Sequence, residues 1–210
     1  MIFIENRMFA TVKVEGAVGL TMNTYVLVYN SFVQFEVVLA AYFMKTQSEV
    51  HTLGLNSMPV ISCEGFSINP SAVLGNIDVN AIDLLVIPGG EVEELAANEG
   101  LLALIRSMNA SGKTVAGICG GVTVLKAAGV LEGRSYVDNQ EGREAAESSK
   151  GLPDAGASDE VNVIRDGNIL TAKPNGYVDF ALELGRMMDI YQDEADLQET
   201  IDFFKYFKSV

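Results

Sequence analysis

The stretch KTVAGICGGVTVLKAAGV, residues 113–130, changes character at a single cysteine. Residues 114–118 form a short run of apolar and β-branched character, which indicates a buried strand. The run ends at Cys119, passes through two glycines and continues with the apolar spacing of a helix. A cysteine between a buried strand and a helix start is typical of a nucleophile elbow, in which a sharp turn holds the side chain above the sheet.

Cys119 has two interpretations from this spacing alone. The free N–H groups at the start of the following helix place partial positive charge near the sulfur, which favours the reactive thiolate. A buried cysteine is equally common as a small packing residue, and such a cysteine is inert. The surroundings of the sulfur therefore decide between the two.

The composition restricts the class of protein. The chain has 210 residues, 49% of them hydrophobic, and a formal net charge of −14. The length suits one domain with a good-sized core, and no window is apolar enough for a membrane helix. The acidic balance argues against a nucleic-acid partner, because phosphate contacts need basic patches. Two cysteines and one histidine supply neither a disulfide framework nor a zinc cluster, so we expect no metal, no cofactor and a reducing, cytoplasmic location.

Strand and helix patterns alternate along the chain. The expected strands cover residues 25–29, 49–55, 59–63, 82–87 and 114–118, with a hairpin formed by 161–165 and 169–172. The expected helices cover 31–45, 91–97, 101–109, the segment after Cys119, 175–188 and 193–208. This alternation predicts an α/β fold: a flavodoxin-like, doubly wound and mostly parallel sheet with helices on both faces.

Three regions are expected along the chain. Residues 1–22 form an N-terminal extension, residues 23–190 form the α/β domain, and residues 191–210 form a C-terminal amphipathic helix. That helix places four apolar residues on one side, namely Leu197, Ile201, Phe204 and Phe207. Ser31 and Gln34 have the spacing of a capping box, which predicts the start of the first helix.

Ligands of parallel sheets bind beyond the carboxyl ends of the strands, so the turns after Tyr29, Ile87 and Ile118 are expected to meet. Gly89 and Gly90 follow the second of these strands and, with the N–H of Gly120, are candidates for binding an oxyanion. The same two glycines also fit a simple tight turn after a proline.

Glu36 is the only charged residue between Phe32 and Met44. Burying it costs several kcal/mol unless it is paired or neutralised, and desolvation raises the pKa of a carboxyl. A protonated Glu36 can donate a hydrogen bond to a thiolate. In the other interpretation Glu36 lies in the first helical turn, where the helix dipole favours an acid, and points to solvent.

Four segments together resemble the ThiJ/PfpI superfamily, to which the Parkinsonism-associated deglycases belong and which has the class I glutamine amidotransferase-like fold. In order they are YVLVYNSFVQFEVVLA, DLLVIPGG, AGICGGVTVLKAAGVLEGR and GNILTAKPNGYVDFALELG, within residues 23–190. The resemblance implies that Cys119 is the elbow cysteine, Glu36 the acid that hydrogen-bonds it, and the three glycines the oxyanion-binding turns. It also implies a homodimer.

This chain lacks the histidines that are common in the family. Members commonly carry a histidine directly after the cysteine, where this chain has Gly120, or further on, where it has Tyr136 to Asn139. The single histidine, His51, lies on an expected strand before the cysteine. A Cys–His–acid triad within one chain, and with it the release of ammonia from glutamine, is not expected.

What remains is a Cys119–Glu36 pair. A thiolate needs no base to attack an activated carbonyl, so we expect a cysteine-dependent hydrolase or glyoxalase-type enzyme on small carbonyl or amide compounds, with Glu36 moving the proton. Asp138 and Asn139 are candidates, from position only, for orienting substrate or water. Alternatively Cys119 is the oxidisable sensor of a stress-responsive or chaperone-like protein with little turnover. Cys63, at the end of an expected buried strand, is expected to be a packing residue.

Overall fold

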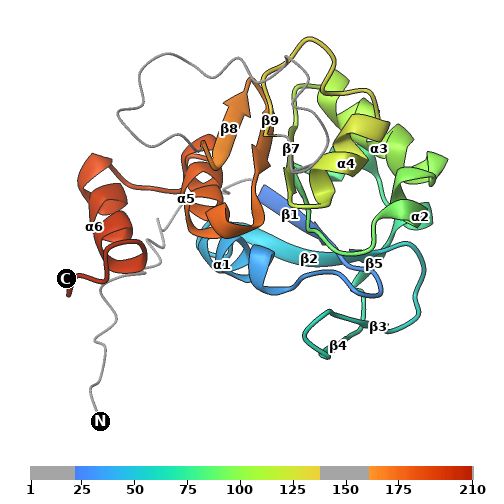
Figure 1. Cartoon of the computed structure of the whole chain (residues 1–210), viewed down its shortest axis with the longest axis horizontal. Helices are drawn as coiled ribbons and strands as arrows, with labels where there is room; N and C mark the ends of the chain where they lie inside the picture. Colours follow the sequence, from blue (N-terminus) through green and yellow to red (C-terminus); the bar gives the residue numbers. More distant parts are fainter. Residues whose placement is uncertain (1–21, 138–160, 210) are drawn as a thin grey trace, which may run out of the picture.

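The computed structural model describes residues 22–137 and 161–209. A central sheet separates two layers of helices (Figure 1). The strands of this sheet are β1 (Met22–Leu27), β2 (Ser48–Gly54), β5 (Ala72–Val73), β6 (Leu84–Ile87), β7 (Thr114–Ile118), β8 (Val163–Asp166) and β9 (Ile169–Ala172). The helices are α1 (Phe35–Met44), α2 (Glu93–Ala96), α3 (Glu99–Ala110), α4 (Gly121–Ala127), α5 (Tyr177–Met187) and α6 (Glu194–Phe204).

The strands are arranged in the order β5-β2-β1-β6-β7-β9-β8. Neighbours in this order are parallel, except that β8 and β9 form an antiparallel hairpin. The predicted α/β fold with a mostly parallel, doubly wound sheet is confirmed. The carboxyl ends of β1, β6 and β7 therefore lie beside one another, as the sequence predicts.

Alternation along the buried strands creates two apolar cores. In β6, Leu84 and Val86 belong to the core beneath α1, α5 and α6, whereas Leu85 and Ile87 belong to the core beneath α2, α3 and α4. Each face of the sheet thus has its own helical cover. None of the helices in residues 22–137 and 161–209 has the length and apolar character that crossing a membrane requires.

The strand predicted at residues 59–63 is shorter than expected and lies outside the central sheet. Only β3 (Val60–Ile61) forms there, and it pairs with β4 (Ser67–Ile68) in a separate antiparallel hairpin outside the central sheet. The place beside β2 in the central sheet is taken by β5 instead. Cys63 is consequently exposed and is not the packing residue of a buried strand.

The start of α1 also differs from the prediction. Ser31 has a φ of 66°, which excludes it from a right-handed helix, and α1 begins at Phe35 without a side-chain cap from Gln34. The carboxylate of Glu64 accepts hydrogen bonds from the N–H groups of Gln34 at 3.1 Å and Phe35 at 2.9 Å. A residue from the β3–β4 hairpin therefore replaces the predicted capping box.

The C-terminal helix packs as predicted except at its end. Asp193 caps α6 by accepting from two backbone N–H groups, and Leu197 is buried. Phe204 packs edge-on against Phe43 of α1, with ring centroids 4.9 Å apart. Phe207 lies beyond the helix with a φ of 55° and is 89% exposed, so its predicted place on the apolar side is wrong.

Candidate active site

The turn from β7 to α4 places Cys119 at the carboxyl edge of the sheet. Cys119 has a φ of 54°, in the left-handed region that side chains seldom adopt, and its N–H donates to the carbonyl of Ala172 at 3.0 Å. Such a conformation is kept only where the surrounding structure enforces it. Cys119 thus lies in a strained turn between β7 and α4.

Gly89, in the turn after β6, lies against Cys119. A Cβ atom added to Gly89 would lie 2.7 Å from the sulfur of Cys119 and 2.9 Å from Oε2 of Glu36. No side chain fits in this space, so glycine is required by the close approach of the two turns. The predicted meeting of these turns is confirmed.

Glu36 is buried, with 1% of its surface exposed, and the interpretation that it points to solvent is wrong. Its Oε2 accepts a hydrogen bond from the N–H of Gly89 at 2.7 Å, and its carboxyl also hydrogen-bonds Cys119. Burial raises the pKa of Glu36, while the hydrogen bonds from Gly89 and Cys119 partly offset this rise. The α1 helix therefore delivers one acid directly to the sulfur.

The pKa of Cys119 moves opposite to the direction expected from a helix N-terminus. Burial raises it to about 11, the charge and hydrogen bond of Glu36 add to this, and a hydrogen bond from the Gly120 N–H lowers it by less. A negative charge on Cys119 beside a negative charge on Glu36 is costly, so the thiol and the carboxyl titrate as a coupled pair. Burial and Glu36 therefore favour the thiol form of Cys119, whereas the helix terminus by itself favours the thiolate.

Tyr29, two residues beyond the end of β1, is a site residue that no motif in the sequence predicted. Its hydroxyl donates to the carbonyls of Gly89 at 2.7 Å and Pro88 at 3.2 Å. Burial raises the pKa of Tyr29, and the charges of Glu36 and Cys119 raise it further, so the hydroxyl stays a donor. The available signal was a tyrosine at the carboxyl end of a buried strand, where its hydroxyl needs a partner.

The N–H groups of the three glycines that are candidates for binding an oxyanion have different hydrogen-bond partners. The N–H of Gly89 is engaged by Glu36, and that of Gly120 by the sulfur of Cys119. The N–H of Gly90, whose φ is 134°, has no acceptor among the residues the structure describes. The Gly89 N–H is therefore not available to an oxyanion, whereas the Gly90 N–H remains a candidate donor to one.

Comparison with known proteins identifies the family. Residues 22–187 match the model of the DJ-1/PfpI family. This chain belongs to the DJ-1/PfpI family. It is 28% identical over 158 residues to Deglycase TK1284 from Thermococcus kodakarensis, covering 74% of this chain and 92% of that protein. It is 32% identical over 141 residues to an isonitrile hydratase from Pseudomonas putida, covering 66% of this chain and 58% of that protein.

Solved structures of the family have the same fold. Drosophila melanogaster DJ-1beta aligns with a TM-score of 0.72 at 23% identity, covering 87% of this chain and 97% of that one. A thiJ/pfpI family protein from Bacillus anthracis aligns with a TM-score of 0.74 at 22% identity, covering 89% of this chain and 93% of that one.

The histidine position is filled differently in this DJ-1/PfpI protein. A Cβ atom on Gly120 would lie 3.0 Å from Val92 and 3.2 Å from the carbonyl of Gly90, so the space beside the sulfur is already occupied. His51, the single histidine of the chain, lies on β2 and stacks on Tyr25 at 4.7 Å, with β1 and β6 between it and β7. No His–Cys pair is therefore formed.

Two further predictions concern other parts of the site. Asp138 and Asn139, the candidates for orienting a substrate, lie outside the described residues. Within 22–137 and 161–209, no group of three or more His, Cys, Asp or Glu side chains could hold a metal ion.

Proposed function

We propose that this protein is a cysteine-dependent enzyme of the glyoxalase or hydrolase type, acting on small carbonyl or amide compounds. The observation that carries the proposal is that the buried carboxyl of Glu36 and the sulfur of the half-buried Cys119 both lie against Gly89 and hydrogen-bond each other at the carboxyl edge of the sheet. Glu36 serves as the base that takes the thiol proton when the sulfur attacks, so no resting thiolate and no histidine is needed.

The proposed steps balance for methylglyoxal as substrate. The sulfur of Cys119 bonds to the aldehyde carbon while its proton passes through Glu36 to the carbonyl oxygen, which gives a hemithioacetal. Glu36 then moves a proton from that carbon to the neighbouring carbonyl carbon, and the hydroxyl proton of the hemithioacetal passes to the neighbouring carbonyl oxygen. The first carbon thereby becomes the carbonyl of a thioester with Cys119, and the second carries the new hydroxyl group. Water hydrolyses the thioester, and the sum is methylglyoxal plus water giving lactate. In this proposal the Gly90 N–H is the candidate donor to the oxyanion.

The relatives support the class of chemistry. One is named a deglycase and another an isonitrile hydratase, and both names describe reactions of small functional groups. We infer from these names only that a family site can carry out reactions of this kind.

The test compares methylglyoxal consumption and lactate formation by the wild-type protein, Cys119→Ala and Cys63→Ala. We expect Cys119→Ala to fall to the rate without enzyme, and the exposed Cys63→Ala to keep its activity. Glu36→Gln should lose on the order of 10²- to 10⁴-fold, the usual contribution of a proton-transfer group. Equal conversion by wild type and Cys119→Ala would rule out methylglyoxal as a substrate of this cysteine.

The redox-sensor alternative ranks second. Oxidation proceeds through the thiolate, and the raised pKa of Cys119 keeps the thiolate fraction low at neutral pH. Intact mass after mild peroxide is the measurement, and addition of oxygen at Cys119 without turnover of methylglyoxal would reverse this ranking.

We also propose a cytoplasmic homodimer. In support, the α1 helix presents two apolar side chains, Phe35 and Val38, that are about half exposed. Phe35 lies next to Glu36, so a second copy covering this face would further shield the site from water.

A further inference from the structure

A second hollow lies away from Cys119, between β8, α5 and α6. It has a volume of about 310 Å³, near the lower end of small-ligand pockets. Apolar side chains supply part of its wall, from Val163 on β8, Leu182 on α5, and Ile201 and Tyr206 at the C-terminal helix. Neither Glu36 nor Cys119 lines it, so it is a separate feature of the fold.

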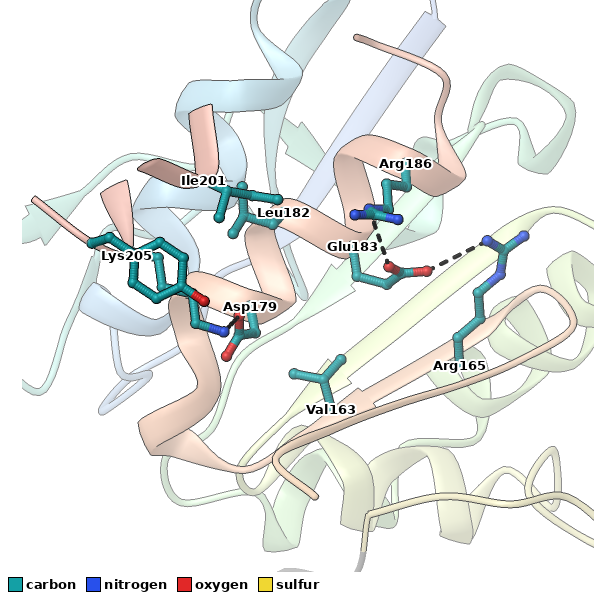
Figure 2. Close-up of a pocket in the computed structure, with 9 residues that line it drawn as sticks. Val163, Arg165, Asp179, Leu182, Glu183, Arg186, Ile201 and Lys205 are labelled. Atoms are coloured by element: carbon teal, nitrogen blue, oxygen red, sulfur yellow. Dashed lines mark hydrogen bonds and ion pairs between the residues drawn. The ribbon is translucent and has the colours of Figure 1, made fainter. Parts of the chain in front are cut away.

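Figure 2 shows the charged side of this hollow, where Glu183 lies between Arg165 and Arg186. One carboxylate oxygen is 3.4 Å from Nη1 of Arg165, and the other is 3.9 Å from Nε of Arg186. Two positive charges thus share one negative charge, which leaves this corner positive in a chain of net charge −14. At the other end Lys205 and Asp179 form a neutral pair at 2.6 Å.

The two guanidinium groups keep donors for a further anion. Each has five N–H groups, and a strong charge-assisted hydrogen bond is about 2.7–2.9 Å long. The contacts of Arg165 and Arg186 to Glu183 are longer than this, and both side chains are about half exposed. Exposed pairs of this kind contribute little free energy, so an incoming carboxylate can compete with Glu183.

We propose that this hollow binds a small organic carboxylate with an aliphatic or aromatic body. Its carboxylate is held by Arg165 and Arg186, and its apolar part rests on Leu182 and Ile201. The site suits both parts of such a ligand. The planar guanidinium groups match the geometry of a carboxylate, and the apolar side chains contact the aliphatic or aromatic part and exclude water from it. This site is independent of the reaction proposed at Cys119.

The test is a two-dimensional amide NMR titration of the full chain with sodium benzoate, against sodium chloride at the same ionic strength. Neutral benzamide is the matched probe without the charge. We expect saturable shifts at Val163, Leu182 and Ile201 with benzoate and much weaker ones with benzamide. The same titration of Cys119→Ala should be unchanged.

The arginine variants and the Glu183 variant are expected to change the affinity for benzoate in opposite directions. The double variant Arg165→Gln, Arg186→Gln should weaken benzoate binding by about tenfold or more, the loss of charge-assisted hydrogen bonds. Glu183→Gln should tighten it several-fold, because the competing carboxylate is gone. Glu99→Gln is the control, since Glu99 pairs with Arg106 on the exposed surface of α3 and should leave binding unchanged.

The proposal would be overturned by shifts that map to the Cys119 turn, by equal binding of benzoate to the double arginine variant, or by no tightening in Glu183→Gln. Unfolding cannot produce the gain expected of Glu183→Gln, so this variant remains decisive even if the arginine variants are less stable. Shifts that rise linearly with benzoate, without saturation, would equally contradict a built site.

Discussion

At the scale of single residues, one carboxyl group determines the character of the site. Glu36 lies in an apolar helix, is buried, and is held by the N–H of Gly89. Because the carboxyl also touches the sulfur of Cys119, burial and charge act on both acids together. The result is a thiol with a raised pKa and a base in contact with it.

Glu36→Gln is predicted to lower the pKa of Cys119 from about 11 toward its usual value, because the variant removes a negative charge that disfavours the thiolate. Burial remains, so the shift should be partial. Ultraviolet titration of the thiolate in a Cys63→Ala background is the measurement. A higher pKa in the variant would show instead that Glu36 is protonated and donates to a thiolate, and an unchanged titration would exclude direct contact.

Tyr29→Phe is predicted to lower the free energy of unfolding by about 1–3 kcal/mol, because two buried carbonyls, those of Pro88 and Gly89, lose their donor. It should also lower kcat on methylglyoxal more than it changes KM, since the Gly89 turn positions Glu36. Urea denaturation and steady-state kinetics check this. Tyr177→Phe is the control, because that tyrosine contacts Phe35 through its ring. Wild-type values in Tyr29→Phe would mean that the turn holds its shape unaided.

At the scale of elements, the first turn of α1 depends on a distant hairpin. Burial acts to raise the pKa of Glu64, but hydrogen bonds from the N–H groups of Phe35 and Gln34 outweigh it and lower the pKa overall. A lowered pKa in the folded state means that the stabilisation is present above the unfolded pKa and is lost as the pH falls through the folded one.

Glu64→Ala is accordingly predicted to cost about 1 kcal/mol at neutral pH, the usual value of a lost N-terminal cap, and less in acid. Because the carboxylate is exposed, solvent screening keeps the cost from rising above this. Thermal unfolding at neutral and acidic pH is the measurement, with Glu199→Ala on α6 as the control. A stability loss that did not shrink in acid would contradict the role of the charge.

At the scale of the whole molecule, the sheet brings the ends of β1, β6 and β7 to one edge and leaves β8, α5 and α6 to form a second hollow elsewhere. The two sites are therefore separable in experiments. The apolar face of α1 gives the prediction for assembly: light scattering should give twice the 22.6 kDa mass of one chain. Val38→Glu should reduce this toward the single-chain mass, and a monomeric wild-type mass would remove the homodimer.

The sequence by itself determined most of the helices and central strands and their order. Strand and helix periodicity, the β7–α4 elbow and the lone acid of α1 are local patterns, and local patterns predicted the parallel sheet and the meeting of its turns. The strand at residues 59–63 failed because pairing decides whether a short apolar run joins a sheet, and β5 took that place.

Only the tertiary structure decided the chemistry of the site. The Glu36–Gly89 and Tyr29–Gly89 hydrogen bonds join residues 53 and 60 positions apart, and the Glu64–Phe35 cap joins residues 29 apart. The spacing of apolar residues predicts only contacts between residues within about one or two helical turns, so it cannot predict these distant hydrogen bonds. The direction of the Cys119 pKa followed from burial and from Glu36, not from the helix terminus that the local sequence displays.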